Sequence, residues 1–394
     1  MSEESKKWSA LIVLSLAGLL AMGLWFSATA VVPALADEWN LNPAQISWIT
    51  ISVQMGFVTG TILSAFFNLP DIFRSRHLFA ICALSGAAFN AAIGLFSESY
   101  NSAVILRFLT GAALAGVYPP GMKIMATWFE KRRGMALGIL VGGLATGSAL
   151  PHLLKTLGSP DWRLLMLNSS AMAVIAGLLC VLFVKDGPHL SETAKFNWKY
   201  IGIAFRNKGI RQVTFGYLGH MWELYAMWTW IPVFLLESFR TAGVLELQWS
   251  ASAASFLVIG TGGIGCAFAG FLADRYGRPE ITIYSMIISG LCCVVAGLFF
   301  GASPFLVLFI CLVWGLTIVS DSAQFSACLA DLSEPAYAGT VLTLQTCLGF
   351  SLTFISIRLI PYFVDLLTWK YAFTILVIGP LFGIISMYRF KRAG

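Results

Sequence analysis

The 394-residue chain has few charged residues. Asp, Glu, Lys and Arg make up 11% of it, whereas soluble domains carry about a quarter. Its mean hydropathy is +0.80, and the long runs 251–272 and 281–303 contain no charge at all. About 20 apolar residues in a helix cross the hydrocarbon layer of a membrane. The composition therefore excludes a soluble domain and predicts an integral membrane protein.

The chain also lacks the patterns that would indicate an enzyme or a disulfide-stabilised fold. All eight cysteines lie inside apolar runs, so no disulfide framework is predicted. No H-E-x-x-H, G-x-S-x-G or Walker A sequence is present, and the G-x-G-x-x-G match at 260–265 lies inside a membrane run. The apolar run after Lys7 continues past Ala30, which is too long for a signal-peptide core and predicts a retained first helix. We expect no enzyme activity, no cofactor, no metal and no nucleic-acid partner.

Two short charged loops lie half a chain apart. Residues 270–278 read G-F-L-A-D-R-Y-G-R between two apolar runs, and residues 67–76 read F-N-L-P-D-I-F-R-S-R. The pattern G-x-L-x-D-R-x-G-R in this setting resembles the loop between the second and third helices in each half of the major facilitator superfamily (MFS). Many transporters are built from repeated halves. The resemblance implies an all-α integral membrane protein with 12 transmembrane helices in two six-helix bundles.

Hydropathy and charge give the predicted topology. Residues 1–184 form the N-terminal bundle, 185–212 a cytoplasmic linker, and 213–394 the C-terminal bundle. Basic residues concentrate in the segments that would face the cytoplasm, as the positive-inside rule requires. We expect a multi-pass monomer in the cytoplasmic (inner) membrane with both termini in the cytoplasm. The twelve predicted spans are 9–35, 44–68, 78–96, 102–128, 135–157, 164–184, 213–237, 249–272, 280–300, 304–330, 337–362 and 371–388.

Away from the ends of these spans, five charged residues lie at membrane depth: Arg107, Lys123, Glu223, Asp321 and Arg358. A charge at membrane depth is costly, so we expect each to face a cavity or a partner. The resemblance implies that helices one, four, seven and ten line a central cavity, and four of the five charges lie on them. Glu223 and Asp321 are proton-coupling candidates, because a desolvated carboxylate can load and release a proton as the cavity opens. Arg107 and Lys123 either hold an anionic substrate group or neutralise these acids; cross-domain ion pairs without substrate contact are the alternative.

Other residues are weaker cavity candidates. His220 lies one turn before Glu223 on the same helix face and suits a proton relay, although a packed neutral histidine fits equally well. His152 and Arg358 lie at similar depth on equivalent helices and are candidates for an outer gate. Further candidates to line the cavity are Trp25, Gln54, Tyr118, Trp222, Trp228 and Gln324.

Charged residues of the inner loops are candidates for a latch that closes this side. Carboxylates are favourable at helix N-termini, so we expect Asp71 to face the start of the fifth span and Asp274 the start of the eleventh. Glycines 138, 142, 143 and 147 predict close packing of the fifth span. The predicted gating residues are Asp71, Arg76, Arg132, Arg133, Asp274, Arg275, Arg278 and Glu334.

The resulting hypothesis is a secondary active transporter that moves a small solute, preferably a small organic or inorganic anion, by proton-coupled alternating access. Its partners would be the solute, protons and membrane lipid. One alternative is a proton-driven exporter of amphipathic, drug-like or cationic compounds. A second is a non-transporting receptor on the same scaffold.

Overall fold

The computed structural model describes residues 3–67, 69–129, 132–158, 161–188, 200, 202, 204–245, 247–334 and 337–393. Within these ranges the chain is a bundle of long helices. They comprise α1 (Glu3–Met22), α2 (Ser27–Ala30), α3 (Val32–Trp39), α4 (Pro43–Phe66), α5 (Leu69–Ile72), α6 (Ser75–Phe96), α7 (Tyr100–Leu114), α8 (Tyr118–Trp128), α9 (Arg133–Thr156), α10 (Trp162–Phe183), α12 (Lys208–Thr241), α13 (Leu247–Tyr276), α14 (Arg278–Leu298), α15 (Pro304–Ile318), α16 (Ser322–Leu332), α17 (Ala338–Ala372), the 3-10 helix η2 (Phe373–Val377) and α18 (Ile378–Ala393).

These helices correspond to all twelve predicted spans. Ten described helical segments are long and apolar enough to cross a membrane, and the segment 338–392 contains the last two predicted spans. The seventh predicted span lies within α12. Within α17, four residues before its end, Thr368 has φ 62°, and the chain turns back at this kink toward η2 and α18. The architecture is therefore the predicted all-α membrane fold.

Three predicted spans are each broken into shorter helices. The first span leaves the helix at residues 23–26, between α1 and α2, where the sequence has no proline. The fourth is broken before Tyr118, and prolines occupy the first turn of α8, where their missing N–H costs nothing. The tenth is broken between α15 and α16, with Asp321 directly before α16. All three breaks lie at mid-span and free backbone groups there.

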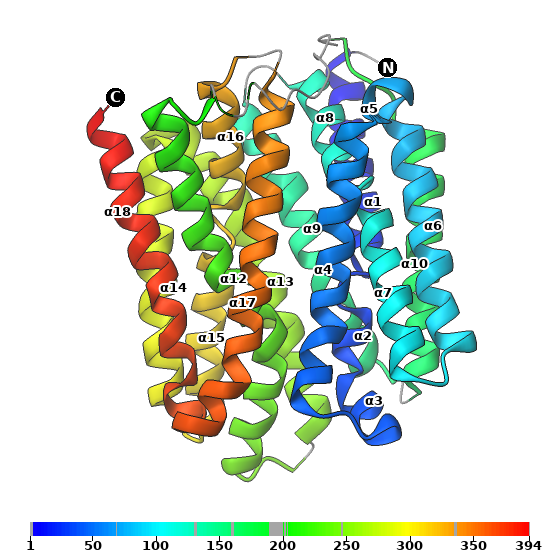
Figure 1. The fold of residues 1–394 in the computed structure, drawn as a ribbon, viewed down its shortest axis with the longest axis vertical. Coiled ribbons are helices and arrows are strands. Elements are labelled where there is room, and N and C mark those ends of the chain that lie inside the picture. The colour runs from blue at the N-terminus through cyan, green and yellow to red at the C-terminus, as the bar shows by residue number, and fades with distance from the viewer. Residues whose placement is uncertain are drawn as a thin grey trace.

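The first and second halves of the chain lie side by side, and both termini are at the same end of the molecule (Figure 1). We call this the inner end and the opposite one the outer end. In the N-terminal half, residues 3–188, α4 packs on α7, α6 on α10, and α1 on both α9 and α10. In the C-terminal half, residues 204–393, α12 packs on α17 and α18, and α13 on α15. The halves meet mainly through α9 with α13 and α4 with α17. The predicted linker core, residues 189–199, lies outside the described residues.

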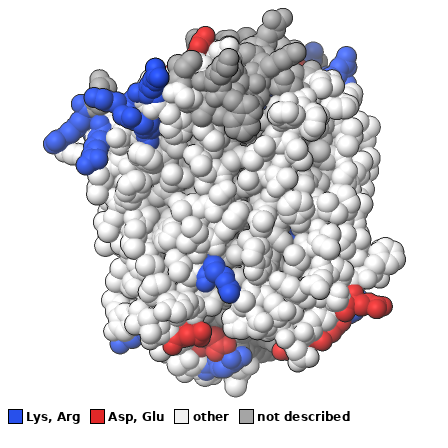
Figure 2. All heavy atoms as spheres, viewed as in Figure 1, with Lys and Arg blue, Asp and Glu red and all other residues white. Residues whose placement is uncertain are grey.

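The surface between the two ends is largely uncharged. In Figure 2 the acidic and basic side chains gather at the ends, and a broad white band between them is interrupted by one basic patch. Large apolar side chains are exposed along this band, among them Ile105 at 61% and Ile264 at 65%. In water such a surface would be strongly unfavourable, so it is the surface expected of a protein that spans a membrane.

Glycines let the two halves approach closely along α9 and α13. A Cβ atom added at Gly138 or Gly142 would lie 2.7 or 2.5 Å from the carbonyl oxygen of Cys266 or Gly263 in α13. Gly143 faces the backbone of α1 in the same way, at 2.9 Å from Ser15 O. The predicted packing role of these glycines is confirmed, and one row of them forms part of the contact between the halves.

Candidate functional site

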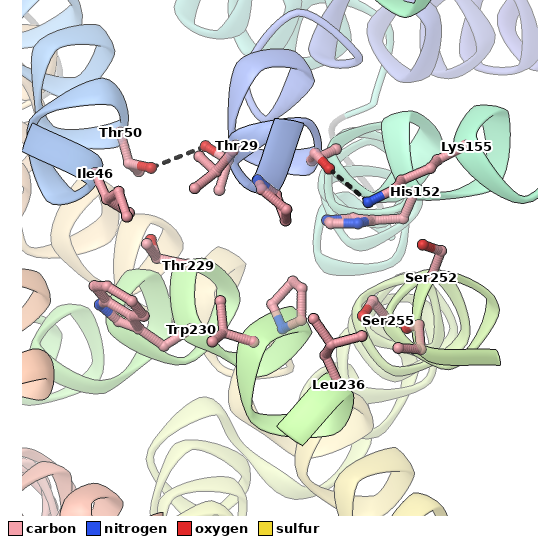
Figure 3. A pocket seen from close by; sticks show the side chains of 16 residues that line it. Thr29, Ile46, Thr50, His152, Lys155, Thr229, Trp230, Leu236, Ser252 and Ser255 are labelled. Carbon is pink, nitrogen blue, oxygen red and sulfur yellow. Dashed lines mark hydrogen bonds between the residues drawn. The ribbon is translucent and has the colours of Figure 1, made fainter. Parts of the chain in front are cut away.

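A pocket lies between the two halves near the outer end. Figure 3 shows the labelled side chains converging on it from α2, α4 and α9 of the N-terminal half and from α12 and α13 of the C-terminal half. Its empty space is about 630 Å³ when the part that is open to solvent is included. We call it the outer pocket. Its position between the halves makes it a candidate site for a solute.

The ionisable side chains that line the outer pocket, His152 and Lys155, are both bases. His152 is 2% exposed, and its Nε2 atom has no hydrogen-bond partner among the described residues. Lys155 Nζ donates to the Ala30 carbonyl over 3.4 Å. Thr29 and Thr50 share a hydrogen bond of 2.8 Å across the pocket wall. An anion would therefore meet positive charge and neutral hydroxyl groups here, and no carboxylate among the lining residues.

Six aromatic rings pack together at the contact between the halves, toward the inner end from the lining residues Thr29, Thr50 and Thr229, and we call them the aromatic layer. Trp25 and Phe26 come from the break before α2 and Phe57 from α4; Tyr225 and Trp228 come from α12 and Phe350 from α17. Rings of opposite halves touch: the centroids of Phe57 and Phe350 are 4.7 Å apart, and those of Trp25 and Tyr225 are 5.7 Å apart. One helical turn toward the outer end, Thr353 of α17 donates to Gln54 Oε1 of α4. The layer thus separates the outer pocket from the inner end.

A buried imidazole–carboxylate pair lies below the aromatic layer. His220 Nδ1 of α12 is 2.8 Å from Asp321 Oδ1, and both side chains are nearly inaccessible, at 1% and 2%. This oxygen receives no well-aligned hydrogen bond among the described residues, so the pair is a close contact rather than a linear hydrogen bond. Tyr118 of the N-terminal half pairs through its hydroxyl with Ser326 of α16. The predicted candidates His220, Asp321 and Tyr118 therefore lie near the contact between the halves.

Glu223 lies in a different environment, inside the C-terminal half. Its Oε1 atom accepts from Trp314 Nε1 at 2.6 Å and from Cys293 Sγ at 3.2 Å, and its Oε2 atom accepts from Ser289 Oγ at 3.0 Å. These donors belong to α14 and α15. A carboxylate with three donors is held firmly in place. The sequence assigned the same proton-coupling role to both acids, but their environments differ: Asp321 contacts an imidazole, and Glu223 is fixed by neutral donors.

Arg107 is completely buried and serves the backbone of its own half. Its guanidinium donates to the carbonyls of Leu24, at 2.8 Å, and Trp25, and more weakly to Ser27 Oγ and Ile49 O. The carbonyls of Leu24 and Trp25 are those that the break after α1 releases from helical hydrogen bonding. Arg107 therefore holds the segment that carries Trp25 and Phe26, and the structure brings it to neither Glu223 nor Asp321.

The other two charges within spans also differ from the expectation. Arg358 on α17 is exposed and is not a lining residue of the outer pocket, whereas His152 is buried in that pocket. The two predicted gate residues therefore do not share a site. Lys123 on α8 is half-buried. Sequence reasoning missed two residues, Lys155 and Asn90. Lys155 lies at the outer end of the fifth predicted span. The Asn90 amide contacts Ser27, Met166 and Ser170; a polar residue inside an apolar span was the available signal for it.

At the inner end, Asp274 reaches from the C-terminal half to the N-terminal half. Its Oδ2 atom accepts from Met135 N, at the start of α9, over 3.2 Å. The prediction that Asp274 faces the start of the eleventh span is wrong, because the first turn of α9 offers its free N–H groups instead. Gly134 makes this possible, since a Cβ there would overlap the Asp274 carboxylate. The predicted gating residue Arg278 pairs with Asp331 within the C-terminal half.

The remaining predicted gating residues are less engaged. Arg275 lies over the ring of Tyr276 at 5.2 Å, and the backbone N–H of Glu334 donates to the Tyr200 hydroxyl at 3.2 Å. Arg76 donates to Val184 O at 3.4 Å, and Arg132 is exposed at the start of α9 with φ 60°. The side chains of Asp71 and Arg133 lie outside the described part of the structure. Within the described residues, no three His, Cys, Asp or Glu side chains come together as a metal site.

The family model described as Major Facilitator Superfamily matches residues 14–357. The chain belongs to this superfamily. Proteins similar to this MFS chain include a putative niacin/nicotinamide transporter of Bacillus subtilis, 25% identical over 69% of each chain. A hexuronate transporter of Escherichia coli is 23% identical over 47% of this chain and 44% of its own length. A probable sulfoacetate transporter of Cupriavidus necator is 24% identical over 62% of this chain and 59% of its own. The MFS chain is thus a multi-pass membrane transporter.

Proposed function

We propose that the protein is a secondary active transporter that carries a small organic anion across the cytoplasmic membrane by proton-coupled alternating access. The observation that carries this proposal is the outer pocket, where the ionisable lining residues His152 and Lys155 are both bases. A carboxylate can accept hydrogen bonds from Lys155 and from the buried His152 ring, and charge-assisted bonds of this kind are the strong ones.

The names of similar proteins support an anionic solute. Hexuronate and sulfoacetate are organic anions, and niacin is a carboxylate at neutral pH; these are named for three of the similar transporters. At identities of 23–25%, solutes can differ between relatives, so the proposed solute class rests first on the residues of this chain's own pocket. The basic pocket and these names favour the same chemical class.

Contacts between the halves support alternating access. The inner end is held shut by the Asp274 carboxylate at the start of α9, and the aromatic layer lies between the outer pocket and that end. To release a solute inward, Asp274 must leave α9 and the rings of the two halves must part. We further infer that each half is a rigid six-helix bundle in a monomer, and that the inner end faces the cytoplasm because basic residues gather there.

The pair His220–Asp321 is the proton-coupling site in this proposal. It lies below the aromatic layer, where it changes from one aqueous side to the other as the halves move. Imidazole and carboxylate side chains are common proton donors and acceptors in proteins. Glu223 instead stays with Ser289, Cys293 and Trp314 and acts as a fixed acceptor within the C-terminal half.

Uptake into proteoliposomes with an acidic exterior tests the proposal, with labelled glucuronate, sulfoacetate and nicotinate as probes and protein-free liposomes as the control. We expect the gradient to accelerate uptake of an anion from this set. Asp321→Asn should lose this acceleration but keep exchange of internal for external anion, whereas Glu223→Gln should keep the acceleration and lose thermal stability. Uptake of none of these anions together with efflux of a cationic dye would support the exporter alternative; full gradient stimulation of Asp321→Asn would refute the assigned coupling site.

A further inference from the structure

Three buried N–H donors, two in the aromatic layer and one a helical turn away from it, have no partner in the protein itself. Trp25 Nε1, Trp228 Nε1 and Gln54 Nε2 have no hydrogen-bond partner among the described residues. The three side chains are 1%, 3% and 0% exposed. Buried donors are almost always paired, so each unpaired one needs an explanation. All three are donors, and together they call for an acceptor such as a carboxylate.

These donors belong to one continuous cluster that spans both halves. The Trp25 ring lies 5.7 Å from Tyr225 and 5.5 Å from Phe350, and Trp228 lies 5.5 Å from Tyr225. Gln54 is one turn from Phe57 on α4, and its carbonyl oxygen already accepts from Thr353 of the opposite half. This hydrogen bond orients the Gln54 amide, and its NH₂ group remains available to donate to a ligand.

We propose that the aromatic layer is the site where the solute is enclosed during transport, and that the preferred solute is a flat, unsaturated carboxylate. This inference rests on the proposed transport of an anion. As the halves separate, such a molecule enters between Trp25 and Phe57 on one side and Tyr225 and Phe350 on the other. Its carboxylate then takes the free N–H groups of the two indoles and of Gln54.

Ring geometry explains why a flat solute is preferred. Three of the ring contacts across the halves are tilted, with centroids 4.7–5.7 Å apart, which is in the range in which aromatic pairs attract. A planar ring inserted between them replaces each broken ring contact with a new one. A saturated ring of the same size is thicker and has no π face. Loss of such contacts corresponds to about a tenfold weaker affinity.

Binding of benzoate and cyclohexanecarboxylate to the purified protein in nanodiscs tests this inference by calorimetry. The two acids have the same charge and ring size, so their difference reports on planarity alone. We expect benzoate to bind about tenfold more tightly. The Trp25→Phe/Trp228→Phe double variant keeps the rings and removes both donors, so benzoate should bind about tenfold more weakly. The matched control is Trp8→Phe, because Trp8 makes an edge contact with Phe129 outside the layer.

Equal affinity for the two acids, or no binding of benzoate, overturns the inference. So does unchanged benzoate binding by the double variant, provided that its unfolding temperature matches that of Trp8→Phe. If the double variant does not fold, the comparison of the two acids on the wild-type protein still decides. Gradient-driven uptake of non-aromatic anions with equal affinity for the two acids would remove this inference and leave the proposed function standing.

Discussion

Replacing Gly142 with alanine adds a methyl group at the contact between α9 and α13. The new Cβ would lie 2.5 Å from Gly263 O, a backbone atom, whereas ordinary contact begins at 3.4 Å. The two helices must therefore separate locally by about 1 Å. Neither helix can relieve the overlap by rotating a side chain, because the atom on the far side is main-chain carbonyl.

The cost of this change falls on the contact between the halves rather than on the fold of either half. Overpacking by one methyl group typically costs about 1–3 kcal/mol, and about 1.4 kcal/mol is a factor of ten in an equilibrium. The inner-closed arrangement, in which Asp274 rests on the start of α9, should thus become about tenfold less populated. Gradient-driven transport should slow by a similar factor.

Labelling of Cys266 by a small membrane-permeant thiol reagent measures this opening. Cys266 is completely buried beside the contact, so we would use a variant in which it is the sole cysteine. Gly142→Ala should be labelled about tenfold faster. Gly260→Ala is the matched control, because a Cβ at Gly260 meets nothing closer than 3.9 Å. Equal labelling rates for Gly142→Ala and the unsubstituted protein would refute the role assigned to the α9–α13 contact.

Two further predictions concern polar contacts. Arg107→Gln removes the charged donors from the carbonyls of the break after α1, and charge-assisted hydrogen bonds contribute about 1.5–3 kcal/mol each. The free energy of unfolding should therefore fall by about 3 kcal/mol, seen as a lower melting temperature in detergent. An unchanged melting temperature would contradict this assignment. At the outer end, the hydrogen-bonded Arg163 holds the pKa of Glu38 below its usual range. The stabilisation from this pair is complete above pH 4.5, the ordinary value, and is lost as the pH falls through the lower pKa of the folded state. Glu38→Gln should therefore lower the free energy of unfolding at pH 7 by less than about 1 kcal/mol for a half-exposed pair, seen as a slightly lower melting temperature. The difference from wild type should shrink as the pH is lowered from 7 toward 3; a difference that stays constant over this range would exclude this pair as its source.

Hydropathy alone predicts the helices of this protein. In lipid, each span must form its backbone hydrogen bonds within itself and must expose apolar side chains. The break at Tyr118 was also predictable, since two prolines follow it directly. The break at residues 23–26 was not, because no proline or charge marks it; its cause is Arg107, which lies more than 80 residues away and takes up the released carbonyls. Local sequence contains no trace of such a distant donor.

The candidate site was predicted only in part, for a similar reason. A charge within a span signals a partner, but it does not say which. Glu223 and Asp321 look equivalent in the sequence, yet Glu223 faces α14 and α15 while Asp321 meets His220. His152 and Arg358 lie at similar depth, yet one is buried in the outer pocket and the other is exposed. Rotation of a helix by one residue decides whether a side chain faces the pocket, another helix or the lipid. Because these spans are apolar on all sides, their hydropathy does not predict that rotation.

The most direct test of the account is the effect of Lys155→Gln on anion uptake driven by a pH gradient, with Lys370→Gln as the control. Lys370 is exposed near the outer end of the C-terminal half and does not line the outer pocket. If the anion loads at Lys155, its loss should raise KM for the transported anion at least tenfold, because a charge-assisted hydrogen bond contributes about 1.5–3 kcal/mol, while Lys370→Gln should leave KM unchanged. An unchanged KM in Lys155→Gln, or equal increases in both variants, would contradict anion loading in the outer pocket.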